Sequence, residues 1–117
     1  MAHPVLQFQI LSKNPDEAAQ FYGDVFNWAI DANNALGYRT INTGSPDGIQ
    51  GGIWPAPPQA PTFTQLFIGV DDINQSLARA SNAGAKILIP ATRLPEGDVM
   101  AVLHDPQGMP FALWQKP

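Results

Sequence analysis

The sequence contains no cysteine and few charged residues, and both shortages narrow the functions that it can have. Without cysteine the chain has no disulfides, no thiolate metal ligands and no cysteine nucleophile. Only 14% of its residues are charged, against roughly 25% in a typical globular domain. A surface with so few charges is expected to be partly covered, most simply by a second copy of the chain.

Basic residues and long apolar runs are also scarce. Six lysines and arginines stand against ten acidic residues, and the net charge of −4 leaves no basic surface for nucleic acid or anionic lipid. No apolar run approaches the ~18 residues of a membrane-spanning helix, and no cationic segment precedes the short apolar run at the N-terminus. We therefore expect a cytoplasmic protein with no nucleic-acid partner and no membrane partner.

An internal repeat organises the residues that are present. The segment SPDGIQGGIW (45–54) returns without a gap as DPQGMPFALW (105–114). Both segments are typical of a Pro-x-Gly turn that leads into an apolar strand ending in tryptophan. In a chain of 117 residues, such a repeat predicts two related halves that fold as one body.

The same register extends upstream of the two turns. Strands are expected over 5–11 and 63–70, with Gln7 and Gln65 at matching positions. Each strand is followed by a capping-box pattern, which predicts the start of a helix. The two N-caps are Asn14 and Asp72. The expected apolar faces of the helices are Ala18, Phe21, Tyr22 and Val25 in the first, and Ile73, Leu77 and Ala80 in the second.

Shorter extended segments follow each helix, so each half reads as a strand, a helix and two or three further strands. These segments lie at about 37–43, 49–54, 86–89, 99–104 and 111–114. We expect one domain over 1–117, in which a Pro-rich linker over 55–62 joins a first βαβββ module (1–54) to a second (63–117).

Taken in order, the motifs resemble the vicinal oxygen chelate superfamily, the group of glyoxalases, bleomycin resistance proteins and extradiol dioxygenases. The motifs are FY..VFNW (21–28), GGIW (51–54), VDDI (70–73), DPQG (105–108) and FALWQ (111–115). The resemblance covers essentially the whole chain. It implies an α+β protein whose two tandem β-α-β-β-β modules form a cupped, incomplete barrel, the glyoxalase/bleomycin resistance-like fold.

The resemblance also implies where a metal would bind. Metalloenzymes of the superfamily hold a divalent metal with side chains from the first and last strand of each module, and these positions fall here on Gln7, Gly52, Gln65 and Ala112. Glycine and alanine supply no ligand, and amide oxygens are neutral. We expect no metal and no other cofactor. The alternative is a divalent metal recruited unconventionally, for which Gln7, Gln65 and His104 would be the residues to test.

Strand alternation indicates which side chains line the cup. Phe8, Ile10 and Ile53 share a uniformly apolar face that should take the helices, so the opposite, concave face is expected to bind a small organic molecule. The expected ligand-binding residues are Gln7, Gln9, Tyr38, Trp54, Gln65, Phe67 and Trp114. The alternative is that the tryptophans only plug a packed sheet and that Gln7 and Gln65 satisfy each other.

Catalytic candidates are few. His104 has inward parity but precedes a turn, and it is a weak candidate for a general acid or base. We expect a metal-independent, small-molecule-binding protein of the bleomycin resistance type that forms a homodimer. A lyase, isomerase or dioxygenase-type enzyme of the glyoxalase family stays open as the alternative, as does a structural subunit whose cup is filled by its own side chains.

Overall fold

The computed structural model describes residues 2–33 and 37–117, and its chain forms two compact units. One unit is Gln7–Gln65, and the other combines the N-terminal residues up to Leu6 with Leu66–Pro117. The first and the fifth strand are therefore each divided between the two units, with one end in each. Among the described residues, neither helix is long and apolar enough to cross a bilayer.

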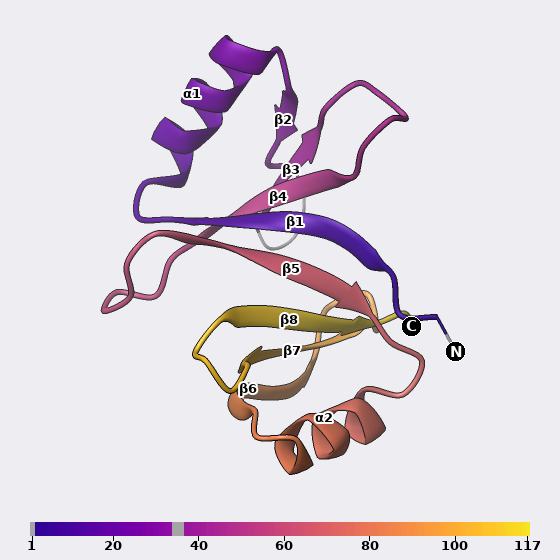
Figure 1. Cartoon of the computed structure of the whole chain (residues 1–117). Coiled ribbons are helices and arrows are strands. Elements are labelled where there is room, and N and C mark those ends of the chain that lie inside the picture. The colour runs from indigo at the N-terminus through magenta and orange to yellow at the C-terminus, as the bar shows by residue number, and fades with distance from the viewer. Residues whose placement is uncertain (1, 34–36) are drawn as a thin grey trace. The chain divides into compact units, whose positions relative to one another are not determined.

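The first half of the chain contains one helix and four strands (Figure 1). The elements are β1 (Val5–Ser12), α1 (Pro15–Phe26), β2 (Ala29–Asp31), β3 (Arg39–Asn42) and β4 (Gln50–Pro55). The strands lie in the order β2-β3-β4-β1, with β1 parallel to β4 and the other pairs antiparallel. This is the β-α-β-β-β arrangement, with the third additional strand that the sequence pattern had left open.

The second half repeats the arrangement. Its elements are β5 (Phe63–Gly69), α2 (Ile73–Asn82), β6 (Lys86–Arg93), β7 (Val99–His104) and β8 (Pro110–Gln115). The strands lie in the order β5-β8-β7-β6, and again the first and last strands of the half, β5 and β8, are parallel. β6 runs past the predicted end at residue 89 because an edge strand tolerates Pro90, whose missing N–H breaks no ladder on its outer side.

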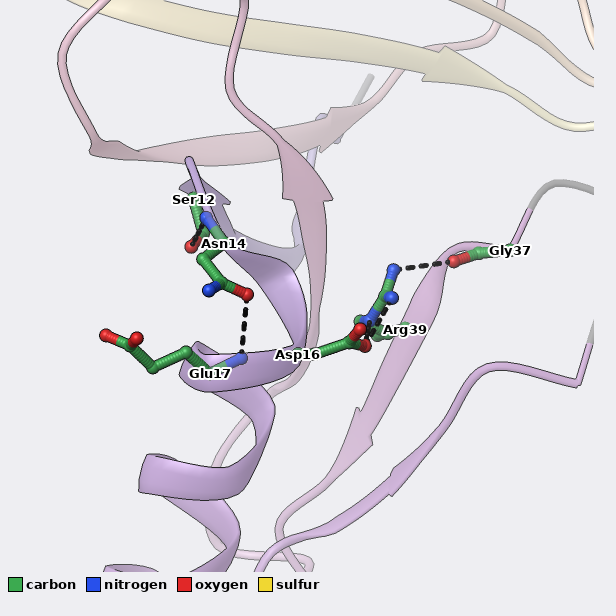
Figure 2. A network of polar contacts seen from close by, with 6 residues as sticks. All are labelled: Ser12, Asn14, Asp16, Glu17, Gly37 and Arg39. Atoms are coloured by element: carbon green, nitrogen blue, oxygen red, sulfur yellow. Dashed lines mark hydrogen bonds and ion pairs between the residues drawn. The ribbon is translucent and has the colours of Figure 1, made fainter.

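Both helices begin at the predicted N-caps. The side-chain oxygen of Asn14 accepts a hydrogen bond from the backbone N–H of Glu17, and Asp72 does the same for Gln75, each at 3.1 Å. Figure 2 shows the first cap and, beside it, the ion pair of Arg39 on β3 with Asp16 in the first turn of α1. Nη2 of Arg39 lies 2.6 Å from Oδ1 of Asp16. The ion pair links the start of the helix to the sheet of the same unit.

The two helices pack differently on their sheets. α2 buries Ile73 and Leu77 in a core that includes Leu103 and Leu113, as predicted. No residue of α1, all of which the structure describes, is buried. The prediction that Phe21 and Val25 face the sheet is wrong, since their exposed fractions are 55% and 53%.

A ring cluster explains how α1 is attached instead. The helix ends at Asn27, which takes the left-handed conformation (φ 59°) and turns the chain so that Trp28 stacks on Tyr22, with ring centroids 5.4 Å apart. Trp28 also lies 5.7 Å from the ring of Phe8 on β1. A Cβ at Gly51, the β4 partner of Phe8, would overlap the Phe8 ring. The rings of Tyr22, Trp28 and Phe8 thus connect α1 to β1.

Candidate functional site

The strand register places the predicted polar residues of the first unit on one face. Gln9 pairs with Gly52 across β1 and β4, and Leu11 pairs with Trp54, so alternate residues from Gln7 onward share the face of Trp54. Phe8 lies on the opposite face and contacts Trp28. The predicted alternation of side chains therefore agrees with the register in this half.

Tyr38 lies directly over Gly52 on this face. Its hydroxyl donates a hydrogen bond to Oε1 of Gln7 at 3.2 Å, and it occupies the space that a Cβ at position 52 would need. The ring of Trp54 lies 4.6 Å from the Tyr38 ring at an angle of 35°. Glycine at position 52 thus makes room for a phenol where related metalloenzymes are expected to carry a ligand.

Gln9 and Gln65 form a second contact in the same unit. The Nε2 of Gln65 donates to Oε1 of Gln9 at 2.7 Å, and the two residues are 7% and 1% exposed. The alternative that Gln7 and Gln65 satisfy each other is wrong, because Gln7 bonds Tyr38 and Gln65 bonds Gln9. Among the described residues, none donates to Oε1 of Gln65, which is buried.

Tyr38 joins the Tyr38–Gln7 bond to the Gln9–Gln65 bond, because it also bonds the side chain of Gln9. Burial raises the pKa of Tyr38 to about 12, although a side-chain hydrogen bond with Gln9 acts to lower the pKa. The phenol therefore keeps its proton at neutral pH and acts as a donor. We call the connected set Gln7, Tyr38, Gln9 and Gln65 the amide–phenol network, and at neutral pH it is uncharged.

The second unit carries the remaining predicted residues. Phe67 pairs with Ala112 and Gly69 with Trp114, and the rings of Phe67 and Trp114 lie 6.5 Å apart. Nε1 of Trp114 donates to Oδ2 of Asp98 at 2.6 Å. Asp98 was not predicted from the sequence. It lies directly before β7, whose first residue pairs with Gln115 beside Trp114, and this position is the signal that could have indicated it.

His104 ends β7 in the second unit, where it pairs with Pro110 and is half-buried. Within residues 2–33 and 37–117, no three histidine or acidic side chains gather into a cluster that could hold a metal. His104 is therefore not part of a metal-binding group in the described part of the chain.

The donor set of the first unit does not fit the superfamily's divalent metal. Gln7 Oε1 accepts from Tyr38, Gln9 Oε1 accepts from Gln65, and position 52 is filled by the Tyr38 hydroxyl. In the second unit, Ala112 is fully buried and has no side-chain donor atom. Hard and borderline divalent ions need carboxylate or imidazole ligands, and these positions supply neither.

An open hollow of about 360 Å³ lies beside the start of α1 and was not predicted. Its lining residues are Ser12, Lys13, Asn14, Glu17, Ala18, Phe21 and Thr62. Ser12 Oγ accepts from the backbone N–H of Asn14, and Asn14 Oδ1 caps the helix (Figure 2). Both oxygens already have donors in the fold, so neither needs a ligand to satisfy it.

Comparison with known sequences matches almost the whole chain to one family. A family model described as a glyoxalase-like domain matches residues 7–114. CFP32, a candidate glyoxylase of Mycobacterium tuberculosis (strain CDC 1551 / Oshkosh), is 28% identical over 108 residues, which cover 90% of this chain and 41% of that protein. The chain thus spans about two fifths of the length of the curated relatives it matches.

Solved structures agree with the fold at low sequence identity. The hypothetical protein BH1468 from Bacillus halodurans C-125 has a TM-score of 0.72 and 12% identity, with 100% of this chain and 96% of that chain covered. Methylmalonyl-CoA epimerase from Mycobacterium tuberculosis has a TM-score of 0.61 and 18% identity, with coverage of 100% and 93%. These likenesses confirm the expected α+β fold of two β-α-β-β-β modules.

Proposed function

The chain belongs to the glyoxalase-like domain family of the vicinal oxygen chelate superfamily, and on that premise we propose that it binds a small organic molecule at the amide–phenol network without a metal. The observation that carries the proposal is the bond of Tyr38 to Gln7 over Gly52. It turns positions that hold a metal in related enzymes into an uncharged hydrogen-bonding surface.

The neighbouring rings support binding of an organic molecule. Small-molecule sites combine a large apolar contact area with a few fixed polar groups. Trp54 and Tyr38 supply aromatic faces and are only half-buried, while Gln7 is half-buried beside them. Aromatic rings and amides on one face can thus hold a flat molecule and orient its polar atoms.

A fragment screen by NMR tests the proposal. The screen is run once with EDTA and once with added zinc, nickel or manganese. We expect neutral aromatic fragments to shift the side-chain amide signals of Gln7, Gln9 and Gln65 equally in both conditions. Stoichiometric metal in protein purified without chelator, or fragment binding that requires an added metal, would contradict metal-independent binding.

We also propose that the chain forms a homodimer through α1. Phe21 and Val25 are more than half exposed and lie with Ala18 on one side of the helix. Apolar side chains at such spacing usually cover a partner. The simplest partner for this side of α1 is a second copy of the chain, because the chain has few charges with which to solvate its surface.

A further inference from the structure

The hydrogen bonds of the amide–phenol network all run in one direction, and the acceptor at the start of the network has no donor. Nε2 of Gln65 donates to Gln9 Oε1, and the Tyr38 hydroxyl donates to Gln7 Oε1. The Tyr38 hydroxyl hydrogen is donated to Gln7, so the phenol oxygen can only accept from Gln9, and the Gln9 atom that bonds it is Nε2. Each member thus donates to the next, from Gln65 to Gln9 to Tyr38 to Gln7.

The acceptor without a donor is Oε1 of Gln65. It is buried, and no donor reaches it from the part of the chain that the structure describes. Turning the amide over would place Nε2 there but would break the 2.7 Å bond to Gln9 and set two oxygens against each other. A buried acceptor without a donor is costly, and natural proteins rarely keep one without a reason.

We infer that Gln65 Oε1 accepts a hydrogen bond from the ligand, and that the ligand is a neutral molecule with an N–H or O–H donor on a flat apolar body. This inference rests on the proposed function. The ligand donor would complete the chain of four hydrogen bonds, in which each bond polarises the next.

The network also determines the charge of the ligand. None of its four members is ionised at neutral pH, and a buried cation or anion without an opposite charge is strongly disfavoured. A neutral donor such as a primary amide or a phenol meets the requirement. The rings of Tyr38 and Trp54 on the same face provide the contact for a flat body.

Three molecules of nearly the same shape test the inference. Benzamide is a neutral donor, acetophenone replaces the donor by a methyl group, and benzamidinium is a cationic donor. We expect benzamide to bind up to about tenfold more tightly than acetophenone, the worth of one hydrogen bond, and more tightly than benzamidinium. Binding is measured by tryptophan fluorescence and by the shift of the Gln65 side-chain amide signal.

Substitution of the acceptor links the preference to one atom. In Gln65→Met the preference for benzamide over acetophenone should disappear, and in Gln65→Glu benzamidinium should become the best of the three. The exposed Gln107 provides the control, since Gln107→Met should leave the order unchanged. Circular dichroism establishes that each variant is folded, and the comparison of the three molecules on the unaltered protein requires no variant.

The outcomes separate this inference from the proposed function. Equal binding of the three molecules, or a benzamide preference that survives in Gln65→Met, would overturn the inference and leave small-molecule binding intact. The inference would also be overturned, with small-molecule binding intact, if none of the three molecules binds while other neutral fragments shift the side-chain amide signals of Gln7 and Gln9. Failure of every fragment in the screen would overturn both.

Discussion

At the scale of single residues, Gly52 and Tyr38 depend on each other. A methyl group at position 52 would overlap the Tyr38 hydroxyl, so Gly52→Ala should displace the ring and break its bond to Gln7. We expect a loss of about 1–3 kcal/mol in the free energy of unfolding, as for other overpacked sites. Gly48→Ala is the matched control, because a Cβ there meets no described atom within 4 Å. Urea unfolding of both variants measures the difference, and equal stability would contradict the placement of Tyr38.

The raised pKa of Tyr38 predicts a pH dependence of stability. The folded state holds the phenolic proton to about pH 12, whereas the unfolded chain releases it near the ordinary pKa of 10.0. The contribution of Tyr38 to stability is thus complete below pH 10 and is lost as pH rises toward 12. Tyr38→Phe should lose less stability over this interval than the unaltered protein. Thermal unfolding at several pH values tests this, and parallel curves for both proteins would refute it.

The pair Gln9 and Gln65 should show coupled energetics. Gln65→Met leaves Gln9 Oε1 buried without its donor and should cost about 1–3 kcal/mol. Gln9→Met with Gln65→Met removes both ends of that bond, so the double variant should lose less than the sum of the two single losses. Denaturant unfolding of the four proteins gives the coupling energy. Strict additivity would mean that the two amides do not interact.

Residue patterns predicted which face these side chains share but not their partners. The alternation from Gln7 to Leu11 was enough to put Gln7, Gln9 and Trp54 on one side, because strand geometry has a period of two. The choice of Gln9 over Gln7 as the partner of Gln65 was not predictable. It depends on Tyr38, which lies directly before β3 and donates its hydroxyl hydrogen to Gln7.

At the scale of elements, α1 and α2 show what a helical pattern predicts and what it leaves open. Both N-caps were correct, because a cap is a local interaction between residues three apart. The buried face of α2 was also correct. The face of α1 was not, because the left-handed Asn27 and the ring of Trp28 lie outside the helix and determine which of its side chains are covered.

Core packing in the second unit makes a quantitative prediction. Leu77 of α2 is 8% exposed within the core, whereas Leu66 of β5 is 51% exposed. Leu77→Ala should cost about 2–5 kcal/mol, the usual range for a buried leucine, and Leu66→Ala, the same chemical change, should cost much less. Guanidinium unfolding of both variants provides the comparison. A larger loss for Leu66→Ala would mean that α2 is not the main cover of this sheet.

At the scale of the whole molecule, the proposed homodimer follows from the exposed side chains of α1. Phe21→Ser with Val25→Ser removes two apolar groups that are each more than half exposed, so the change should cost the fold little and the dimer much. Multi-angle light scattering should give twice 12.6 kDa for the unaltered protein and 12.6 kDa for the double variant. Ile87→Ser with Ile89→Ser, on the exposed edge strand β6, is the control and should remain dimeric. A bulged edge strand that contains Pro90 is poorly suited to pair with another copy, so a dimer lost only in the control variant would move the interface from α1 to β6.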